Sequence, residues 1–220
     1  MNTEQVEALR VLLASSGWLE RTRNFARALR GRSRTPNGLL VVGTPSFEPW
    51  HMAAHLDDES RYAGLPELAP TLVRWAPPSD GPAHLSVGID RIARAGRSET
   101  LLVVGSDSAP DALLERVADA RKGGASILAL DRGDEELDSL AHEALAVRPV
   151  VDPVSFDGAQ HLVSMAVGDA DFESARLAAE AAASGGVPQS AGGGSRSARL
   201  GDVRGRLARL LNAVSGTPDN

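Results

Sequence analysis

Short apolar runs alternate with amphipathic segments through the first two thirds of the chain. The clearest apolar runs are residues 39–42, 101–104 and 127–130, and a glycine follows each of the first two. Runs without a polar interruption are typical of strands buried on both faces, as parallel sheets require. Residues 71–75 and 144–151 form weaker runs and are predicted strands as well.

Apolar positions at helical spacing fill the segments between these runs. The predicted helices are residues 3–30, with a break near 15–17, and then 50–60, 85–95, 111–123, 135–143 and 156–167. Alternating strands and helices imply crossover connections. We therefore predict an α/β fold, a doubly wound parallel sheet in three αβα layers.

The last quarter of the chain has a different composition. We expect the α/β domain to cover residues 1–168, an Ala/Gly/Ser-rich linker 169–198, and an amphipathic helix 199–214. Gly/Ser-rich segments behave as flexible linkers. The final helix has an apolar seam surrounded by arginines, so it can dock on its own domain or on a second copy. An acidic partner or a membrane surface is the alternative.

Composition excludes several classes of function. The chain has no cysteine, so disulfides and thiolate chemistry are absent. Its net charge is −6, which argues against a nucleic-acid partner. Lys122 is its only lysine and no Gly-Lys-Ser/Thr occurs, which excludes a P-loop. No apolar run is long enough to span a membrane and no secretory signal opens the chain, so we expect a cytoplasmic protein.

Two hydroxyl-bearing loops follow the two best predicted strands. Residues 44–49 contain Thr44 and Ser46, and residues 106–110 contain Ser106 and Ser108. In open parallel sheets, ligands bind beyond the carboxyl ends of the strands, and each loop leads into a helix N-terminus that favours an anion. The pattern favours a phosphate ester as ligand. The alternative is that these hydroxyls only cap helices.

The motifs resemble those of sugar isomerase (SIS) domains, and of phosphoheptose isomerases in particular. The resemblance runs over residues 3–168 and rests on the first loop with the His-x-Ala motif at His51, on the second loop, and on Gln160-His161-Leu162 in the last helix. It implies the three-layer fold, a phosphosugar or similar anion as ligand, and a homodimer. It also places His51 and His161 near the ligand.

The chain departs from this family at chemically important positions. Asp107 puts a carboxylate in the expected phosphate loop, where like charge repels a phosphate. Gly158 and Ala159 stand where the resemblance implies a Gln-Glu pair that often carries catalysis or metal. His51 and His55 lie four residues apart and can share a metal, but the resemblance would place the other ligands at positions that this chain lacks. No metal and no cofactor are therefore expected.

Three functions remain open. The first is a non-catalytic or regulatory domain that binds a phosphosugar or related carbohydrate derivative. The second is an aldose–ketose sugar-phosphate isomerase with His161 or Glu48 as base. The third is a dimeric scaffold that presents the C-terminal helix. The missing family motifs favour a protein without enzymatic activity, and Asp107 favours the scaffold.

Overall fold

The computed structural model describes residues 17–82 and 85–168. The predicted helix before residue 17, the linker 169–198 and the helix 199–214 lie outside the described residues. No described helix combines the length and the apolar character that crossing a bilayer needs.

A five-stranded parallel sheet forms the centre of the domain, in the order β2-β1-β3-β4-β5. The strands are β1 Leu39–Val42, β2 Pro70–Val73, β3 Thr100–Val104, β4 Ser126–Asp131 and β5 Glu143–Ala146. The predicted parallel sheet is confirmed, with β1, β3 and β4 at its centre.

One predicted strand is shorter than expected. The run 144–151 ends as a strand at Ala146. Pro149 has no backbone N–H to donate to the ladder, and Val150 adopts a left-handed backbone with φ 71°. The remaining residues of the run form a loop that leads to the last helix.

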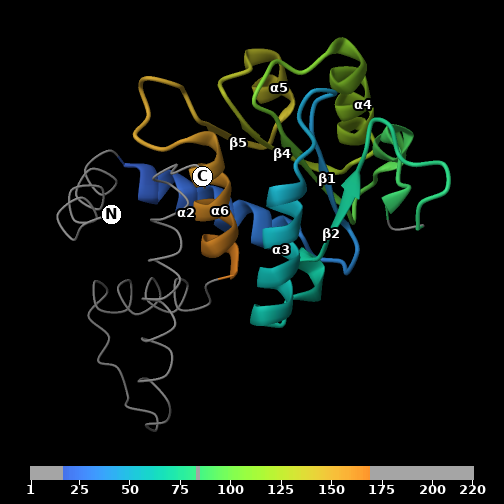
Figure 1. The fold of residues 1–220 in the computed structure, drawn as a ribbon, viewed down its shortest axis with the longest axis horizontal. Helices are drawn as coiled ribbons and strands as arrows, with labels where there is room; N and C mark the ends of the chain where they lie inside the picture. Colours follow the sequence, from blue (N-terminus) through green and yellow to red (C-terminus); the bar gives the residue numbers. More distant parts are fainter. Residues whose placement is uncertain (1–16, 83–84, 169–220) are drawn as a thin grey trace, which may run out of the picture.

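Helices cover both faces of the sheet (Figure 1). They are α2 Trp18–Arg32, α3 Trp50–Ala63, α4 Asp111–Lys122, α5 Glu135–Leu140 and α6 Phe156–Gly168, with short 3-10 helices at Pro66–Leu68 and Ile89–Arg94. The predicted helix 85–95 was too long, because the chain near Gly88 forms a bridge with Arg74 beside β2 and turns into a helix only at Ile89.

Two apolar cores lie on opposite faces of the sheet. Leu39 and Val41 face the core that contains α2, α3 and α6. Leu40 and Val42 face the core that contains α4 and α5. Successive side chains of a strand point to opposite faces, so an unbroken apolar run supplies both cores at once.

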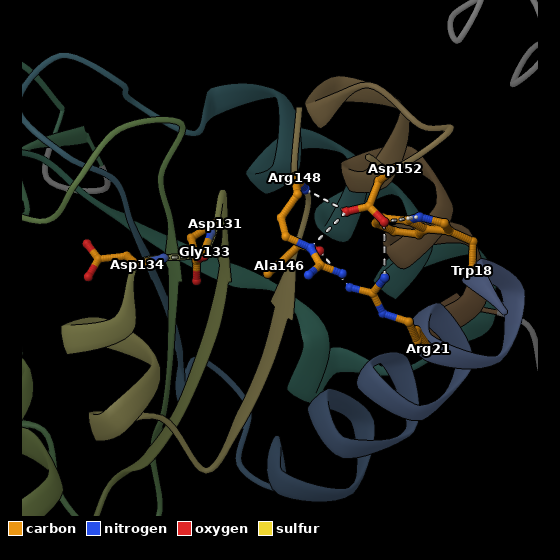
Figure 2. Close-up of polar contacts among 8 residues, drawn as sticks. All are labelled: Trp18, Arg21, Asp131, Gly133, Asp134, Ala146, Arg148 and Asp152. Carbon is orange, nitrogen blue, oxygen red and sulfur yellow. Dashed lines mark hydrogen bonds and ion pairs between the residues drawn. The ribbon is translucent and has the colours of Figure 1, made fainter. Parts of the chain in front are cut away.

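The helix α2 is attached to the loop between β5 and α6 through Asp152. Asp152 accepts hydrogen bonds from the indole of Trp18 at 3.0 Å, from Arg21 at 3.3 Å and from the backbone N–H of Arg148 at 2.6 Å (Figure 2). Arg21 also donates to the carbonyl of Ala146 at 2.6 Å. This network holds the entry to α6, the helix that carries His161.

Candidate functional site

The strand order places a topological switch point between β1 and β3. These strands are neighbours, but the helix after β1 packs on one face of the sheet and the helix after β3 packs on the other. Loops that separate in this way leave a crevice beyond the strand ends, where ligands of open α/β sheets bind. The two hydroxyl-bearing loops, 44–49 and 106–110, are the loops that flank this point.

The first loop turns back tightly on the end of β1. The backbone N–H of Phe47 donates to the carbonyl of Thr44 at 3.2 Å. A Cβ atom added at Gly43 would lie 1.8 Å from the Phe47 carbonyl oxygen, so the turn requires glycine at the end of the strand. Phe47 also contacts Phe156 at the start of α6, with ring centroids 5.5 Å apart. The loop is thus fixed between the sheet and α6.

Asp107 links the two loops across the switch point. The Thr44 hydroxyl donates to Asp107 Oδ1 at 2.7 Å, and the Ser46 hydroxyl donates to Asp107 Oδ2 at 2.5 Å. Thr44 is buried, whereas Ser46 and Asp107 are exposed. The Asp107 carboxylate therefore accepts hydrogen bonds from the two hydroxyls that the sequence pattern assigned to a ligand anion.

The other predicted ligand residues of the second loop do not take part in this arrangement. Ser106 is half-buried and Ser108 is exposed, and neither side chain contributes to the hydrogen bonds between the two loops. The backbone N–H of Ala109 donates to Asp134 Oδ2 at 2.7 Å, which fastens the end of this loop to the start of α5. Sequence reasoning recognised Asp107 as an obstacle to phosphate but missed its bonding partners.

Glu48, one of the two bases considered for an isomerase, is held by other residues. Arg74 donates to its two carboxylate oxygens at 2.6 and 3.2 Å, and the Trp50 indole donates to it as well. The Arg74 guanidinium also lies 4.9 Å from the centroid of the Trp50 ring. Both oxygens of the Glu48 carboxylate are thus engaged by neighbouring side chains, which ties it into the first loop and leaves it poorly placed to take a proton from a substrate.

Three histidines converge between α3 and α6. His51 and His55 lie on successive turns of α3, and His161 of α6 meets them, with Nε2 of His51 2.8 Å from Nε2 of His161. The three ring centroids are 4.3 to 4.5 Å apart. His51 is exposed and the other two are half-buried. The sequence predicted that His51 and His55 share a helix face and that His161 faces the site, but not that the three form one cluster.

The surroundings keep two of these imidazoles neutral. Burial and the neighbouring His55 and His51 lower the pKa of His161 to about 4. Burial and His51 also lower the pKa of His55, against a smaller opposing effect of Asp58. Because a general base works best with a pKa near the operating pH, His161 is a poor base at neutral pH.

An acidic pair lies at the carboxyl end of β4, beside the second loop. Asp131 Oδ1 accepts from the backbone N–H of Gly133 at 2.5 Å and of Asp134 at 3.1 Å (Figure 2). Its other oxygen is buried without a donor among the described residues. Burial and the charges of Asp131 and Asp134 raise the pKa of Asp138 to about 7. Asp138 therefore keeps its proton at pH values where an ordinary carboxyl has lost it.

Comparisons with known proteins give structural neighbours but no sequence relative. No family model matches the chain, and no curated protein does. The sugar isomerase domain of an RpiR transcription factor from Sphaerobacter thermophilus is 15% identical, with a TM-score of 0.45, over 90% of this chain and 92% of that one. The NanR protein of Vibrio vulnificus, solved with ManNAc-6P, is 15% identical, with a TM-score of 0.44, over 79% of this chain and 64% of that one.

A candidate phosphosugar isomerase from Silicibacter pomeroyi is 16% identical, with a TM-score of 0.47, over 79% of this chain and 50% of that one. The chain thus spans about half the length of this structure, and 46% of the length of a similar protein from Salmonella typhimurium. Sugar isomerase domains, the family that the motifs resemble, are among these neighbours. The likeness concerns the fold alone.

Proposed function

We propose that this chain is a non-catalytic, regulatory domain that binds a phosphosugar or related carbohydrate derivative at the switch point between β1 and β3. The observation that carries the proposal is the convergence of Thr44, Ser46 and Asp107 from two loops at the position where open α/β sheets bind their ligands. Hydroxyls and a carboxylate are the groups that hold sugar hydroxyls through hydrogen bonds.

A phosphate ester enters this site by competition. Its oxygens accept from the Thr44 and Ser46 hydroxyls, which requires that Asp107 give up both bonds. Asp107 is exposed, so its side chain can turn toward solvent without breaking the core. Ligand binding would then separate the two loops from each other, and this change is the signal that a regulatory domain needs.

Lack of catalysis is supported by what surrounds the site. Isomerisation through an enediol needs a base near the substrate carbon and a group that stabilises the developing charge. Glu48 is paired with Arg74, and the pKa of His161 is about 4. The resemblance assigns catalysis to positions that hold Gly158 and Ala159 here, and both are buried in α6. Neither residue can transfer a proton.

The proposal is tested by a thermal-shift and calorimetry screen of the full chain with sugar phosphates and with the corresponding neutral sugars. A ligand at 100 times its dissociation constant should add about 2.7 kcal/mol to the free energy of unfolding. Thr44→Val and Ser46→Ala should weaken binding by about tenfold each, whereas Ser139→Ala, which changes an exposed hydroxyl on α5, should not.

Two outcomes would replace the proposal with another function. Interconversion of an aldose phosphate and a ketose phosphate, abolished by His161→Ala, would make the protein an isomerase. Absence of binding to every sugar and sugar phosphate, together with a stable dimer in sedimentation experiments, would favour the scaffold.

A further inference from the structure

We propose that His51, His55 and His161 form a binding site for a divalent transition-metal ion of the Zn²⁺ type. The inference goes beyond carbohydrate binding and does not depend on it. It reverses the expectation from sequence that the chain holds no metal. It begins from the three imidazoles that α3 and α6 bring together.

The contact between the Nε2 atoms of His51 and His161 needs either a proton or a metal ion between them. Their Nε2 atoms are 2.8 Å apart, and two imidazole lone pairs cannot face each other at this distance. Either a proton on one ring or a metal ion between the rings satisfies both atoms. Only one proton fits between one pair of nitrogens, whereas a metal ion accepts a lone pair from the third ring as well.

The third ring is in place for this role. His55 lies one helical turn after His51, and its ring centroid is 4.5 Å from that of His51 and 4.3 Å from that of His161. Each histidine offers one ligand nitrogen, and the three atoms lie within 4.8 Å of one another. Tetrahedral zinc with bonds of about 2.0–2.1 Å needs ligand nitrogens about 3.3 Å apart. Metal binding at this site therefore includes a rotation of the side chains that brings the three nitrogens to this spacing.

The backbone supports the geometry that the ion needs. All three histidines are on helices, which position ligands more precisely than loops do. The helices α3 and α6 pack closely, since a Cβ atom added at Gly168 would clash with the side chain of Glu59. The loop that precedes α3 is attached to the start of α6 by the ring contact of Phe47 with Phe156.

Charge and exposure indicate which ion fits and what it can do. Asp58 and Asp157 interact electrostatically with His55 and His161, and their carboxylates favour a cation at the cluster. Three nitrogen ligands select Zn²⁺, Co²⁺, Ni²⁺ or Cu²⁺ over Mg²⁺ and Ca²⁺, which prefer oxygen. His51 is exposed, so a fourth coordination position can take water or a ligand oxygen.

The experiment is a metal titration of the full chain after removal of metal with a chelator. Calorimetry should show one Zn²⁺ per chain, Co²⁺ should give the visible absorption of a low-symmetry nitrogen-ligated site, and Mg²⁺ should not bind. His51→Ala, His55→Ala and His161→Ala should each weaken Zn²⁺ binding at least about tenfold, because losing a ligand costs no less than losing a residue that orients one.

His142→Gln is the matched control, because this histidine lies outside the cluster. Its ring accepts a hydrogen bond from the backbone N–H of Ile127. This substitution should leave Zn²⁺ affinity unchanged. Melting curves without metal show which variants fold. If a variant does not fold, the stoichiometry and the Co²⁺ spectrum of the unmodified chain still test the site. Absence of Zn²⁺ binding, equal affinity in all folded variants, or equal binding of Mg²⁺ would overturn the proposal.

Discussion

The Thr44 hydroxyl donates a 2.7 Å hydrogen bond to the carboxylate of Asp107, although the two residues lie 63 positions apart in the sequence. The bond joins the loop after β1 to the loop after β3. It places an internal anion at the point where a ligand anion is expected in a fold of this kind. Testable consequences follow for this bond and its loops, and for the carboxylates of Asp152 and Asp138.

Replacing Asp107 should change ligand preference. Asp107→Asn removes a negative charge from the site, so phosphosugars should bind about tenfold more tightly, a gain of about 1.4 kcal/mol. Neutral sugars should change little, since the amide keeps an acceptor for Thr44. Calorimetry with matched sugars and sugar phosphates measures the difference. Asp80→Asn, which changes an exposed carboxylate outside the site, should leave both affinities as they are; equal effects of the two variants would refute the competition model.

Gly43 should tolerate no side chain. Its Cβ would lie 1.8 Å from the Phe47 carbonyl oxygen, so Gly43→Ala must displace the first loop and should lower the free energy of unfolding by more than about 3 kcal/mol. Gly31→Ala on α2 is the control, because nothing lies within 4 Å of the added atom. It should stabilise the protein by roughly 0.5–1 kcal/mol. Urea unfolding of both variants measures the effect, and similar stabilities would contradict the described turn.

Asp152 should be a major contributor to stability. Asp152→Ala leaves the Trp18 indole and the Arg148 N–H without this acceptor and removes the ion pair with Arg21, and should cost about 2–4 kcal/mol. Asp111→Ala, at an exposed position on α4, should cost much less.

The contribution of Asp152 should also depend on pH. Burial alone would raise its pKa, but the hydrogen bonds from Arg148 and Trp18 and the charges of Arg21 and Arg148 together lower it. A carboxyl with a lowered pKa stabilises the fold above its unfolded pKa of about 3.9 and loses this effect as pH falls through the folded value. The difference between wild type and Asp152→Asn should therefore shrink below about pH 4. A difference that grows there would contradict the ion pair.

Asp138 should give the opposite pH dependence. Its pKa is about 7 in the folded protein, raised by burial and by Asp131. The folded state then holds a proton that the unfolded state has lost, so stability should fall as pH rises from about 4 to 7 and level off above. The residue is partly exposed, so the total loss should be on the order of 1 kcal/mol.

Asp138→Asn should abolish this pH dependence, because an amide does not titrate in this range. Denaturant unfolding at a series of pH values measures the slope, with Asp119→Asn as the exposed control. Parallel pH profiles for wild type and Asp138→Asn would contradict the raised pKa of Asp138.

Dimerisation stays a prediction. The resemblance to sugar isomerase domains implies a homodimer, with the ligand site near the subunit interface. Sedimentation equilibrium of the full chain at micromolar concentration should give twice the chain mass of 23.0 kDa. A monomer at these concentrations would contradict the homodimer prediction.

The fold could be predicted from the sequence because its signal is local. Residues 39–42, 101–104 and 127–130 are apolar at every position, which is typical of a strand covered on both faces. The glycine after β1 and the hydroxyl-bearing loops could be located for the same reason. Local signals also misled: apolar character continued past Ala146, but Pro149 and the left-handed Val150 ended the strand.

The site depended on tertiary structure. Spacing alone put His51 and His55 on one face of a helix. The packing of α3 against α6 decided that His161, 110 residues from His51, completes the cluster. Asp107 could be recognised from sequence as a charge that opposes phosphate, but its two hydroxyl partners come from a different loop. Parallel strands bring together loops that are far apart in sequence, and no local pattern encodes which side chains then meet.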